Sequence, residues 1–249
     1  MTPLQRLARR LGYDLTPRRK VRPLHAQLIA VLERFEISCV LDVGANVGQY
    51  ALTLREWGYR GRIVSFEPLA QPHGTLERRA AGDHGWIVAP RMALGASDGE
   101  IEIKVSAESD MSSPLPQTEL LRQLSPSSRV LGHETVPLRR LDSVGGTYLS
   151  ETDRPFLKID TQGFEAEVLA GADRLLTRLA GVQLELALVQ CYEGEPNFME
   201  MIDLLGVRDF EPYLFLPGYF ERRLCRQLQI DGVFVRRGLS MEPGRDRGL

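Results

Sequence analysis

The sequence contains few of the residues from which disulfide-bonded and metal-binding proteins are built. Its 249 residues include only three cysteines and four histidines. The cysteines, at Cys39, Cys191 and Cys225, are odd in number, and their wide spacing matches neither a disulfide framework nor a zinc motif. We therefore expect three reduced thiols and a cytoplasmic protein, because disulfides are rare in that compartment.

Long apolar runs and an excess of basic charge are also missing. No stretch of 18 or more apolar residues occurs, so no membrane-spanning helix is predicted. The net charge is −2 and the sequence pI is about 6.1. The sequence therefore lacks the excess of basic residues that proteins binding nucleic acid usually carry. The N-terminal residues are basic but have no apolar core, so a secretory signal is not predicted either.

Residues 1–36 are predicted to form a helical segment ahead of the main domain. Leucine and alanine side chains between residues 4 and 11 recur at helical spacing, with arginines on the opposite side. Such a helix either lies on an acidic membrane surface or packs on the domain or on a neighbouring subunit of a homo-oligomer. At the other end, residues 239–249 have too few apolar side chains to fold alone and are expected to be flexible.

Strands and helices alternate over residues 37–238, which we assign to one domain. Aliphatic runs have the composition of buried strands, and helical periodicity fills the intervals between them. The alternation predicts an α/β fold with a doubly wound, seven-stranded, mostly parallel sheet of Rossmann-like type. The expected strands are residues 38–43, 62–68, 86–94, 155–160, 182–189, 211–217 and 229–237, and the expected helices are 49–57, 70–81, 165–176 and 197–205.

An insertion interrupts this alternation between residues 100 and 143. Residues 100–107 alternate apolar and polar side chains, which is typical of a strand with one solvated face. A stretch rich in serine and proline follows, and residues 135–143 resemble another short strand. Long irregular insertions in a compact domain are usually either functional or mobile.

A glycine-rich loop after the first expected strand is the clearest functional signal. Asp42 ends the strand, and Gly44-Ala-Asn46-Val-Gly48 leads into the next helix. Glycine permits a positive φ in the tight turn and lets a ligand approach the backbone, while the helix N-terminus adds positive charge. Because ligands of such sheets lie outside the carboxyl ends of the strands, we expect a nucleoside site here.

The ribose of that nucleoside is assigned to Glu67. This residue ends the second expected strand, 23 positions after Gly44, and an acid there can accept both ribose hydroxyl hydrogens. Pro68, which follows it, and Ala93, at the end of the third expected strand, complete the predicted cofactor site. The alternative is a tight strand–helix turn beside an unrelated surface glutamate, but the loop, Asp42 and Glu67 together favour the site.

The loop differs from the common nucleotide-binding motifs. A dinucleotide site needs a second glycine two positions after the first, and that position is Asn46 here; a P-loop is also missing. Asp-x-Gly-x-x-x-Gly is instead the pattern of methyltransferases that use S-adenosylmethionine, whose sulfonium and amino acid carry no phosphate. Asp42 supplies negative charge near these cationic groups. The alternatives are an oxidoreductase that uses a nicotinamide cofactor and a non-catalytic nucleoside-binding module.

Several stretches resemble the FkbM-type methyltransferases. They are VLDVGANVGQYALTLR, IVSFEP, LELALVQCYEGEP and, as the most specific, FLKIDTQGFEAEVLAGA, which together cover roughly residues 38 to 215. The resemblance implies methyl transfer from S-adenosylmethionine to a hydroxyl, commonly of a sugar, a polyketide or a related secondary metabolite. We therefore expect a small-molecule or oligosaccharide acceptor. The family also has a serine pair in the insertion, which stands here as Ser112-Ser113.

Two carboxylates are predicted to face the acceptor. Asp160 comes just after the fourth core strand, where it would also contact the cofactor, and Glu185 lies in the next strand. Either one of them takes the proton of the acceptor hydroxyl, or both hold a Mg²⁺ that lowers its pKa, as an analogy with catechol-type methyltransferases suggests. The structural alternatives are that Asp160 caps the helix starting near Phe164, and that Glu185 pairs with Lys158.

A third candidate for acid–base chemistry is His133, in the insertion. Its ordinary pKa lies near neutrality, as a general base requires, although a solvated loop histidine is the alternative. His25, His73 and His84 are expected on the surface, away from the strand ends. Tyr192 follows the fifth core strand and is a candidate for lining the acceptor pocket.

Overall fold

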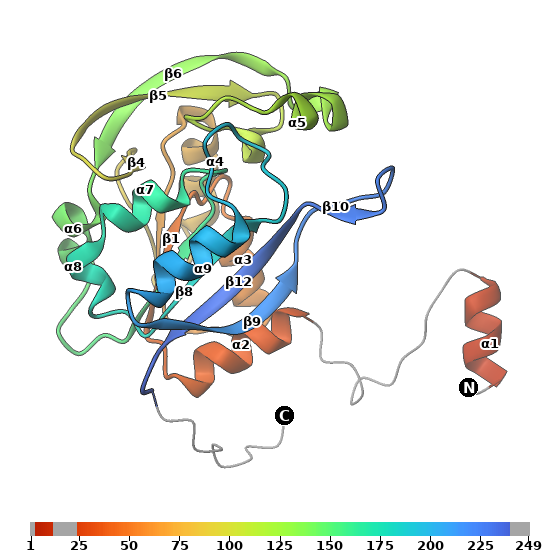
Figure 1. The fold of residues 1–249 in the computed structure, drawn as a ribbon. Helices are drawn as coiled ribbons and strands as arrows, with labels where there is room; N and C mark the ends of the chain where they lie inside the picture. The colour runs from red at the N-terminus through yellow and green to blue at the C-terminus, as the bar shows by residue number, and fades with distance from the viewer. Residues whose placement is uncertain (1–2, 12–23, 240–249) are drawn as a thin grey trace.

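The computed structural model describes residues 3–11 and 24–239, and a seven-stranded sheet lies at its centre (Figure 1). Its strands are β1 (Cys39–Val43), β2 (Arg62–Phe66), β3 (Trp86–Val88), β7 (Pro155–Ile159), β8 (Gly181–Ala187), β9 (Phe210–Pro217) and β12 (Gln229–Arg236). They lie in the order β3-β2-β1-β7-β8-β12-β9. β12 is the one strand of this sheet that runs in the opposite direction to the other six. The predicted mostly parallel α/β sheet is therefore confirmed.

The chain builds this sheet outward from β1 in two directions. It first adds β2 and β3 on one side, then returns to place β7 and β8 on the other. The strand order therefore reverses between β1 and β7, which is the point where open α/β sheets bind ligands. Gly44 follows β1 and Asp160 follows β7, so both lie at this switch point.

Helices cover both faces of the sheet, and each face has its own core. Along β1, Cys39, Leu41 and Val43 belong to one core and Val40 to the other, because successive strand residues point to opposite faces. One core is covered by α2 (Leu24–Arg34), α3 (Gln49–Glu56) and α4 (Ala70–Ala80). The other is covered by α6 (Leu141–Val144), α7 (Glu165–Ala170), α8 (Asp173–Leu176) and α9 (Phe198–Gly206).

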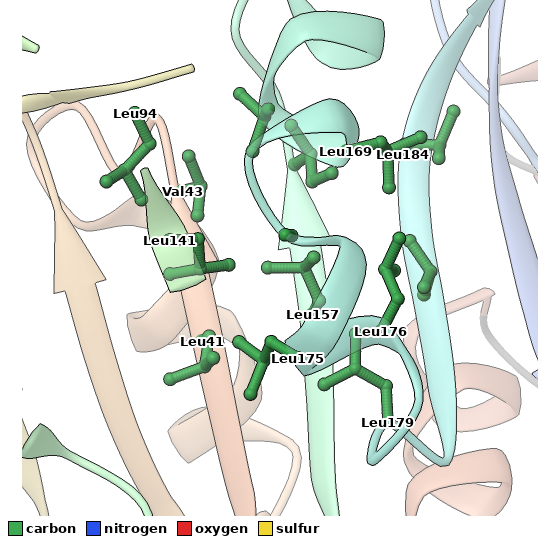
Figure 2. Close-up of a cluster of buried hydrophobic side chains, with 14 of the residues drawn as sticks. Leu41, Val43, Leu94, Leu141, Leu157, Leu169, Leu175, Leu176, Leu179 and Leu184 are labelled. Carbon is green, nitrogen blue, oxygen red and sulfur yellow. The ribbon is translucent and has the colours of Figure 1, made fainter. Parts of the chain in front are cut away.

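Figure 2 shows the core under α6 to α9. Leu41, Leu157 and Leu184 project from three strands of the sheet and meet Leu169 and Leu175 from the helices. Each fully buried leucine contributes roughly 1.5–3 kcal/mol to folding. These side chains hold β1, β7 and β8 together along the part of the sheet that carries the switch point.

The predicted helix over 165–176 is wrong as one element, because it breaks at Gly171. The Gly171 carbonyl accepts a hydrogen bond from the Asp142 backbone N–H at 2.9 Å, which takes it out of the helical ladder. The Asp142 carboxylate then accepts the N–H groups of Arg174 and Leu175, so α8 starts as a new helix. Gly171 is also packed so closely that a Cβ there would lie 1.9 Å from the Gly95 carbonyl oxygen.

The predicted third strand, residues 86–94, is wrong as well. It splits into β3 and β4 (Ala93–Leu94), and Pro90 between them has no N–H to donate to a ladder. β4 leaves the main sheet and pairs with β6 (Val130–Arg139), which in turn pairs with β5 (Gly99–Ser106). β5 and β6 of the insertion therefore form a second, three-stranded sheet together with β4 (Figure 1).

The rest of the insertion and the C-terminal part contain short elements. The strand expected at 135–143 ends at Arg139, since α6 begins at Leu141. The strand pair expected near the C-terminal end is confirmed by β9 and β12. The remaining short elements are η1 (Ser109–Met111), α5 (Glu119–Leu124), η2 (Pro126–Ser128), η3 (Gly145–Thr147), β10 (Phe220–Glu221) and β11 (Arg226–Gln227).

The helix expected near the N-terminus is confirmed as α1 (Pro3–Arg10). The remainder of the predicted N-terminal segment at 12–23 and the predicted flexible tail at 240–249 lie outside the described residues. Within 3–11 and 24–239, no helix has the length and apolar character needed to cross a bilayer. All three cysteines are free thiols, as expected.

The contact at Gly171 leads to a testable prediction. Gly171→Ala would drive a methyl group into the Gly95 carbonyl and should lower the free energy of unfolding by about 1–3 kcal/mol, as overpacking does. Gly82→Ala is the matched control, since a Cβ there meets no atom within 4 Å. Urea unfolding followed by circular dichroism measures both; equal stabilities of the two variants would contradict the close approach.

Candidate functional site

The switch point opens into a pocket with about 660 Å³ of space between the protein atoms, part of it open to solvent. Six of the predicted cofactor residues line it: Gly44, Asn46, Glu67, Pro68, Ala93 and Asp160. The insertion adds Ser109, Asp110, Ser112 and Pro114 to its wall. The pocket thus joins the ends of β1, β2 and β7 to the inserted segment.

Glu67 is built into the loop rather than lying free on the surface. Its Oε2 accepts the Asn46 backbone N–H and its Oε1 accepts the Leu69 N–H, both at 2.8 Å. Burial raises the pKa of Glu67 to about 7, although these two amides act in the opposite direction. The alternative of an unrelated surface glutamate is therefore wrong, and each carboxylate oxygen keeps a lone pair for a further donor.

The two loop glycines are needed because the protein packs closely around them. Gly44 has a φ of 75°, and a Cβ there would lie 1.9 Å from the Asp160 carbonyl oxygen. Gly48 has a φ of 88°, and its Cβ would lie 2.8 Å from Leu76 and Trp86. Gly48 does not line the pocket, so its part in the predicted cofactor site is to let the loop pack under α4 and beside β3.

Asp42 also lies beneath the loop and does not line the pocket. Its side chain is fully buried, its Oδ2 accepts the Ser65 hydroxyl at 3.1 Å, and burial raises its pKa. Its Oδ1 lies 3.4 Å from the Lys158 ammonium but makes no hydrogen bond within the described part of the chain. The structure therefore gives Asp42 a supporting place below the predicted ligand site.

Lys158, on β7, is the buried cation of the site. Its Nζ lies 3.4 Å from both Asp42 Oδ1 and Asp160 Oδ2, and 5.2 Å from the centre of the Tyr50 ring. Burial alone would lower the pKa of Lys158, but the carboxylates of Asp160, Asp42 and Asp231 outweigh burial and hold the pKa above its ordinary value. The alternative in which Glu185 pairs with Lys158 is wrong, because the Lys158 ammonium contacts Asp42 and Asp160 instead.

Asp160 and Glu185 are brought together by Gln162, which sequence reasoning had not singled out. The Gln162 Nε2 donates to Asp160 Oδ1 at 2.7 Å and to Glu185 Oε2 at 3.1 Å. Tyr192 donates to the Gln162 Oε1 at 2.9 Å, and Gln229 Nε2 donates to Glu185 Oε2 at 2.7 Å. One amide therefore links both predicted catalytic carboxylates.

Gln162 reaches this place because its backbone is left-handed, with a φ of 57°. The turn also settles the capping alternative for Asp160: the Thr161 N–H is accepted by Glu165 at 2.8 Å, and α7 begins without a side-chain cap from Asp160. That alternative is wrong. The only sequence signal for Gln162 is its place within the most specific stretch of the family resemblance.

The two carboxylates differ in environment. The Asp160 side chain is 39% exposed and lines the pocket, whereas Glu185 does not line it. Burial raises the pKa of Glu185 well above its ordinary value, and the carboxylates of Asp160, Glu165 and Asp231 add to the effect. Glu185 therefore keeps its proton to a higher pH than a solvated glutamate does, and Asp160 is the carboxylate that a substrate in the pocket can reach.

The arrangement does not fit the predicted Mg²⁺ site. The amide nitrogen of Gln162 donates to both Asp160 and Glu185, so a hydrogen-bond donor takes up the space between the carboxylates. Within 3–11 and 24–239, no group of three or more His, Cys, Asp or Glu side chains has the geometry of a metal site. We therefore assign these residues to hydrogen bonding.

His133 lies away from the pocket. It is on β6, half-exposed, with Nδ1 2.9 Å from Glu102 Oε1 on the neighbouring strand. His133 therefore does not lie with Asp160 on the wall of the pocket, and its position gives no support to the predicted role as general base. The expectation that His73 is on the surface is also wrong, since it is buried and its Nε2 donates to the Ala89 carbonyl at 2.9 Å.

The insertion is tied to the site by serine hydroxyls. Ser109 donates to Asn46 Oδ1 at 3.0 Å, which joins the insertion to the glycine loop. Ser113 donates to the Gln162 carbonyl at 2.7 Å, which joins it to the turn after β7. The serine pair noted in the sequence therefore supports the pocket: Ser113 holds the turn, and Ser112 lines the cavity.

Comparison with known proteins agrees with this geometry. A family model described as the methyltransferase FkbM domain matches residues 42–212. The 2-O-methyltransferase NoeI of Sinorhizobium fredii is 26% identical over 192 residues, which are 73% of this chain and 76% of that protein. Methyltransferase sdnD of Sordaria araneosa is 26% identical over 156 residues, which are 54% of this chain and 60% of that protein.

Solved structures resemble the chain more distantly. TehB from Haemophilus influenzae has a TM-score of 0.45 and 9% identity, over 88% of this chain and 64% of that one. An rRNA methylase from Streptococcus thermophilus has a TM-score of 0.43 and 12% identity, over 87% and 98%. These TM-scores are too low to bear on the site.

The buried cation leads to a prediction about stability. Lys158→Met would leave the carboxylates of Asp42 and Asp160 without a neighbouring cation and should lower the free energy of unfolding by about 3–5 kcal/mol. Adding Asp42→Asn should recover part of the loss, because it removes one unpaired charge. Lys104→Met is the matched control, since Lys104 is only partly buried and its ammonium donates to the Pro114 carbonyl.

Urea unfolding of the four proteins, including the wild type, measures these effects. A loss below about 1 kcal/mol in Lys158→Met, equal to that in Lys104→Met, would show that the ion pair does not hold the site together.

Proposed function

This chain belongs to the methyltransferase FkbM family, and on that premise we propose that it transfers a methyl group from S-adenosylmethionine to a hydroxyl oxygen of a sugar or glycoside. The single observation that carries the proposal is the pocket at the switch point. Its lining includes a buried carboxylate, Glu67, and a more exposed carboxylate, Asp160.

The cofactor part of the proposal rests on the loop and Glu67. A nucleoside placed along the ends of β1 and β2 would lie over Gly44 and donate its ribose hydroxyls to Glu67. Asn46 keeps a side chain where a dinucleotide site needs a glycine, and that side chain is held by Ser109. Family membership together with this loop favours S-adenosylmethionine over a nicotinamide cofactor.

The acceptor part rests on chemistry and on one relative. The name 2-O-methyltransferase of the NoeI protein denotes transfer to an oxygen. An alcohol holds its proton far above neutral pH, so transfer to oxygen is helped by a base beside the hydroxyl. Asp160 is the carboxylate that lines the pocket and can accept this proton. A polyketide-type hydroxyl would use the same base, so an acceptor screen includes it.

The residues around Asp160 keep it in position for this step. When bound, S-adenosylmethionine supplies a methyl group that an oxygen nucleophile can attack. Gln162 fixes Asp160 Oδ1, and the Lys158 ammonium lies beside Oδ2. Glu185 acts through Gln162 and Gln229, as a positioning residue. The remaining rate enhancement comes from holding the hydroxyl and the methyl group in line.

Binding of S-adenosylhomocysteine tests the cofactor assignment and has a predicted pH dependence. Because burial raises the pKa of Glu67 to about 7, the carboxylate that accepts the ribose hydroxyls becomes ionised as the pH rises through that value. The affinity should therefore rise between about pH 6 and pH 8 and then level off.

Isothermal titration calorimetry measures this profile. Glu67→Gln should weaken binding at pH 8 by at least about tenfold and flatten the profile, whereas the exposed control Glu100→Gln should change neither. Absence of binding to the wild-type protein, with saturable binding of NADH instead, would overturn the assignment.

Turnover tests the base. Asp160→Asn keeps an oxygen that can accept from Gln162 but cannot take a proton, so kcat should fall by about 10²–10⁴. Affinity for S-adenosylhomocysteine should stay within a few-fold, because the shape of the side chain is unchanged. The exposed control Asp203→Asn should retain full activity with any acceptor that the wild-type protein methylates. An unchanged kcat in Asp160→Asn would remove it from the mechanism.

A further inference from the structure

A second cavity, of about 890 Å³, opens on the face of the sheet covered by α2 and α3. It shares Gln49 and Asp160 with the cofactor pocket. The two cavities therefore meet at the carboxylate that we assign as the base. A molecule in the second cavity would contact Asp160, as would a ligand in the first.

The walls of this cavity are apolar and aromatic. Trp57 is half-buried at the end of α3, and its ring lies 5.9 Å from that of His25 on α2. Tyr50, one side of whose ring faces Lys158, lines the wall between Trp57 and the sheet. Leu216 completes the wall from β9. Apolar and aromatic walls favour a ligand with extended C–H surfaces. Aromatic rings that carry a polar atom also favour a ligand with polar groups.

The floor is rich in hydrogen-bond acceptors. Asp160 and Asp231 lie on it, from the end of β7 and from β12. Lys158 is the cation there, and Asp42 and Asp160 already flank its ammonium at 3.4 Å. Gln183 Oε1 is likewise occupied, by the Tyr50 hydroxyl at 2.8 Å. Asp160 already accepts from Gln162, and Gln183 bonds to Asp231, but a carboxylate has roughly four acceptor sites, so both aspartates can accept further hydrogens from a ligand.

The charge of the floor restricts the ligand further. One buried ammonium is near three carboxylates, those of Asp42, Asp160 and Asp231, so negative charge is in excess. Burial raises the pKa of Asp231 to about 6 and the Asp160 carboxylate adds to the effect, whereas Lys158 and a hydrogen bond with Gln183 act in the opposite direction. An anionic ligand would be repelled here, and a neutral ligand with several hydroxyl donors would be bound.

We propose that this cavity holds the acceptor, and that the acceptor is a neutral glycosyl unit that lies against Trp57 and donates hydroxyl hydrogens to Asp231 and Asp160. The proposal rests on the proposed function, because it needs the methyl donor in the neighbouring pocket. It adds the place of the acceptor, its charge and its two recognition residues.

Two variants test the cavity without touching the base. Trp57→Ala removes the aromatic wall, and Asp231→Asn replaces a carboxylate by an amide of the same shape. Leu52→Ala is the control, since Leu52 lies on the same helix but is 42% exposed and does not line the cavity. The probes are methyl hexopyranosides, with methyl 2-amino-2-deoxyglucopyranoside and glucose 6-phosphate as cationic and anionic comparators.

Saturation-transfer NMR in the presence of saturating S-adenosylhomocysteine measures the Kd of each probe, and KM is measured where turnover occurs. We expect at least one neutral glycoside to bind and glucose 6-phosphate not to bind. Trp57→Ala and Asp231→Asn should each weaken glycoside binding by at least about tenfold, with the Kd of S-adenosylhomocysteine within twofold. Leu52→Ala should change neither constant, and retained cofactor binding shows that each variant is folded.

The other outcomes separate the two proposals. If S-adenosylhomocysteine binds the wild-type protein but no neutral glycoside does, or if both variants bind glycosides normally, the acceptor assignment fails alone. If both variants lose S-adenosylhomocysteine and glycoside affinity in parallel, the cavity belongs to the cofactor. If S-adenosylhomocysteine does not bind the wild-type protein at all, the proposed function fails and the acceptor assignment falls with it.

Discussion

The buried ammonium of Lys158 is the interaction on which the site depends. It lies 3.4 Å from one carboxylate at the end of β1 and 3.4 Å from another just after β7. Without this cation, the fully buried Asp42 would have no opposite charge beside it, which costs several kcal/mol, and the partly exposed Asp160 would add a like charge nearby. β1 and β7 are also the strands between which the strand order reverses. The Lys158 ammonium therefore links these two central strands and offsets part of the negative charge at the predicted ligand site.

The rest of the site is assembled from segments that are distant in the sequence. The turn after β7 supplies Gln162, whose amide joins Asp160 to Glu185 of the next strand. The insertion supplies Ser109 and Ser113, which fix the glycine loop and that same turn. Asn46, Asp160 and the turn after β7 are thus each held by a hydrogen bond from another side chain.

Periodicity and spacing along the chain were enough to predict the sheet, the glycine loop and the place of Glu67 at the end of β2. These local patterns failed where contacts with a distant segment decide the structure. The helix break at Gly171 depends on Asp142, and the burial of His73 depends on a carbonyl beyond β3. Gln162 could not be assigned, because its two partners meet only when β7 and β8 lie side by side and the turn is left-handed.

The three-stranded sheet of the insertion has a small core of its own, in which Ile103, Val136 and Leu138 pack against Leu69 and Ala93. Its strands share no ladder with the main sheet. Mutations in this sheet therefore alter one wall of the pocket at the switch point while the central strands and their ion pair stay in place. In evolutionary terms, that wall can be remodelled without rebuilding the buried charges beneath it.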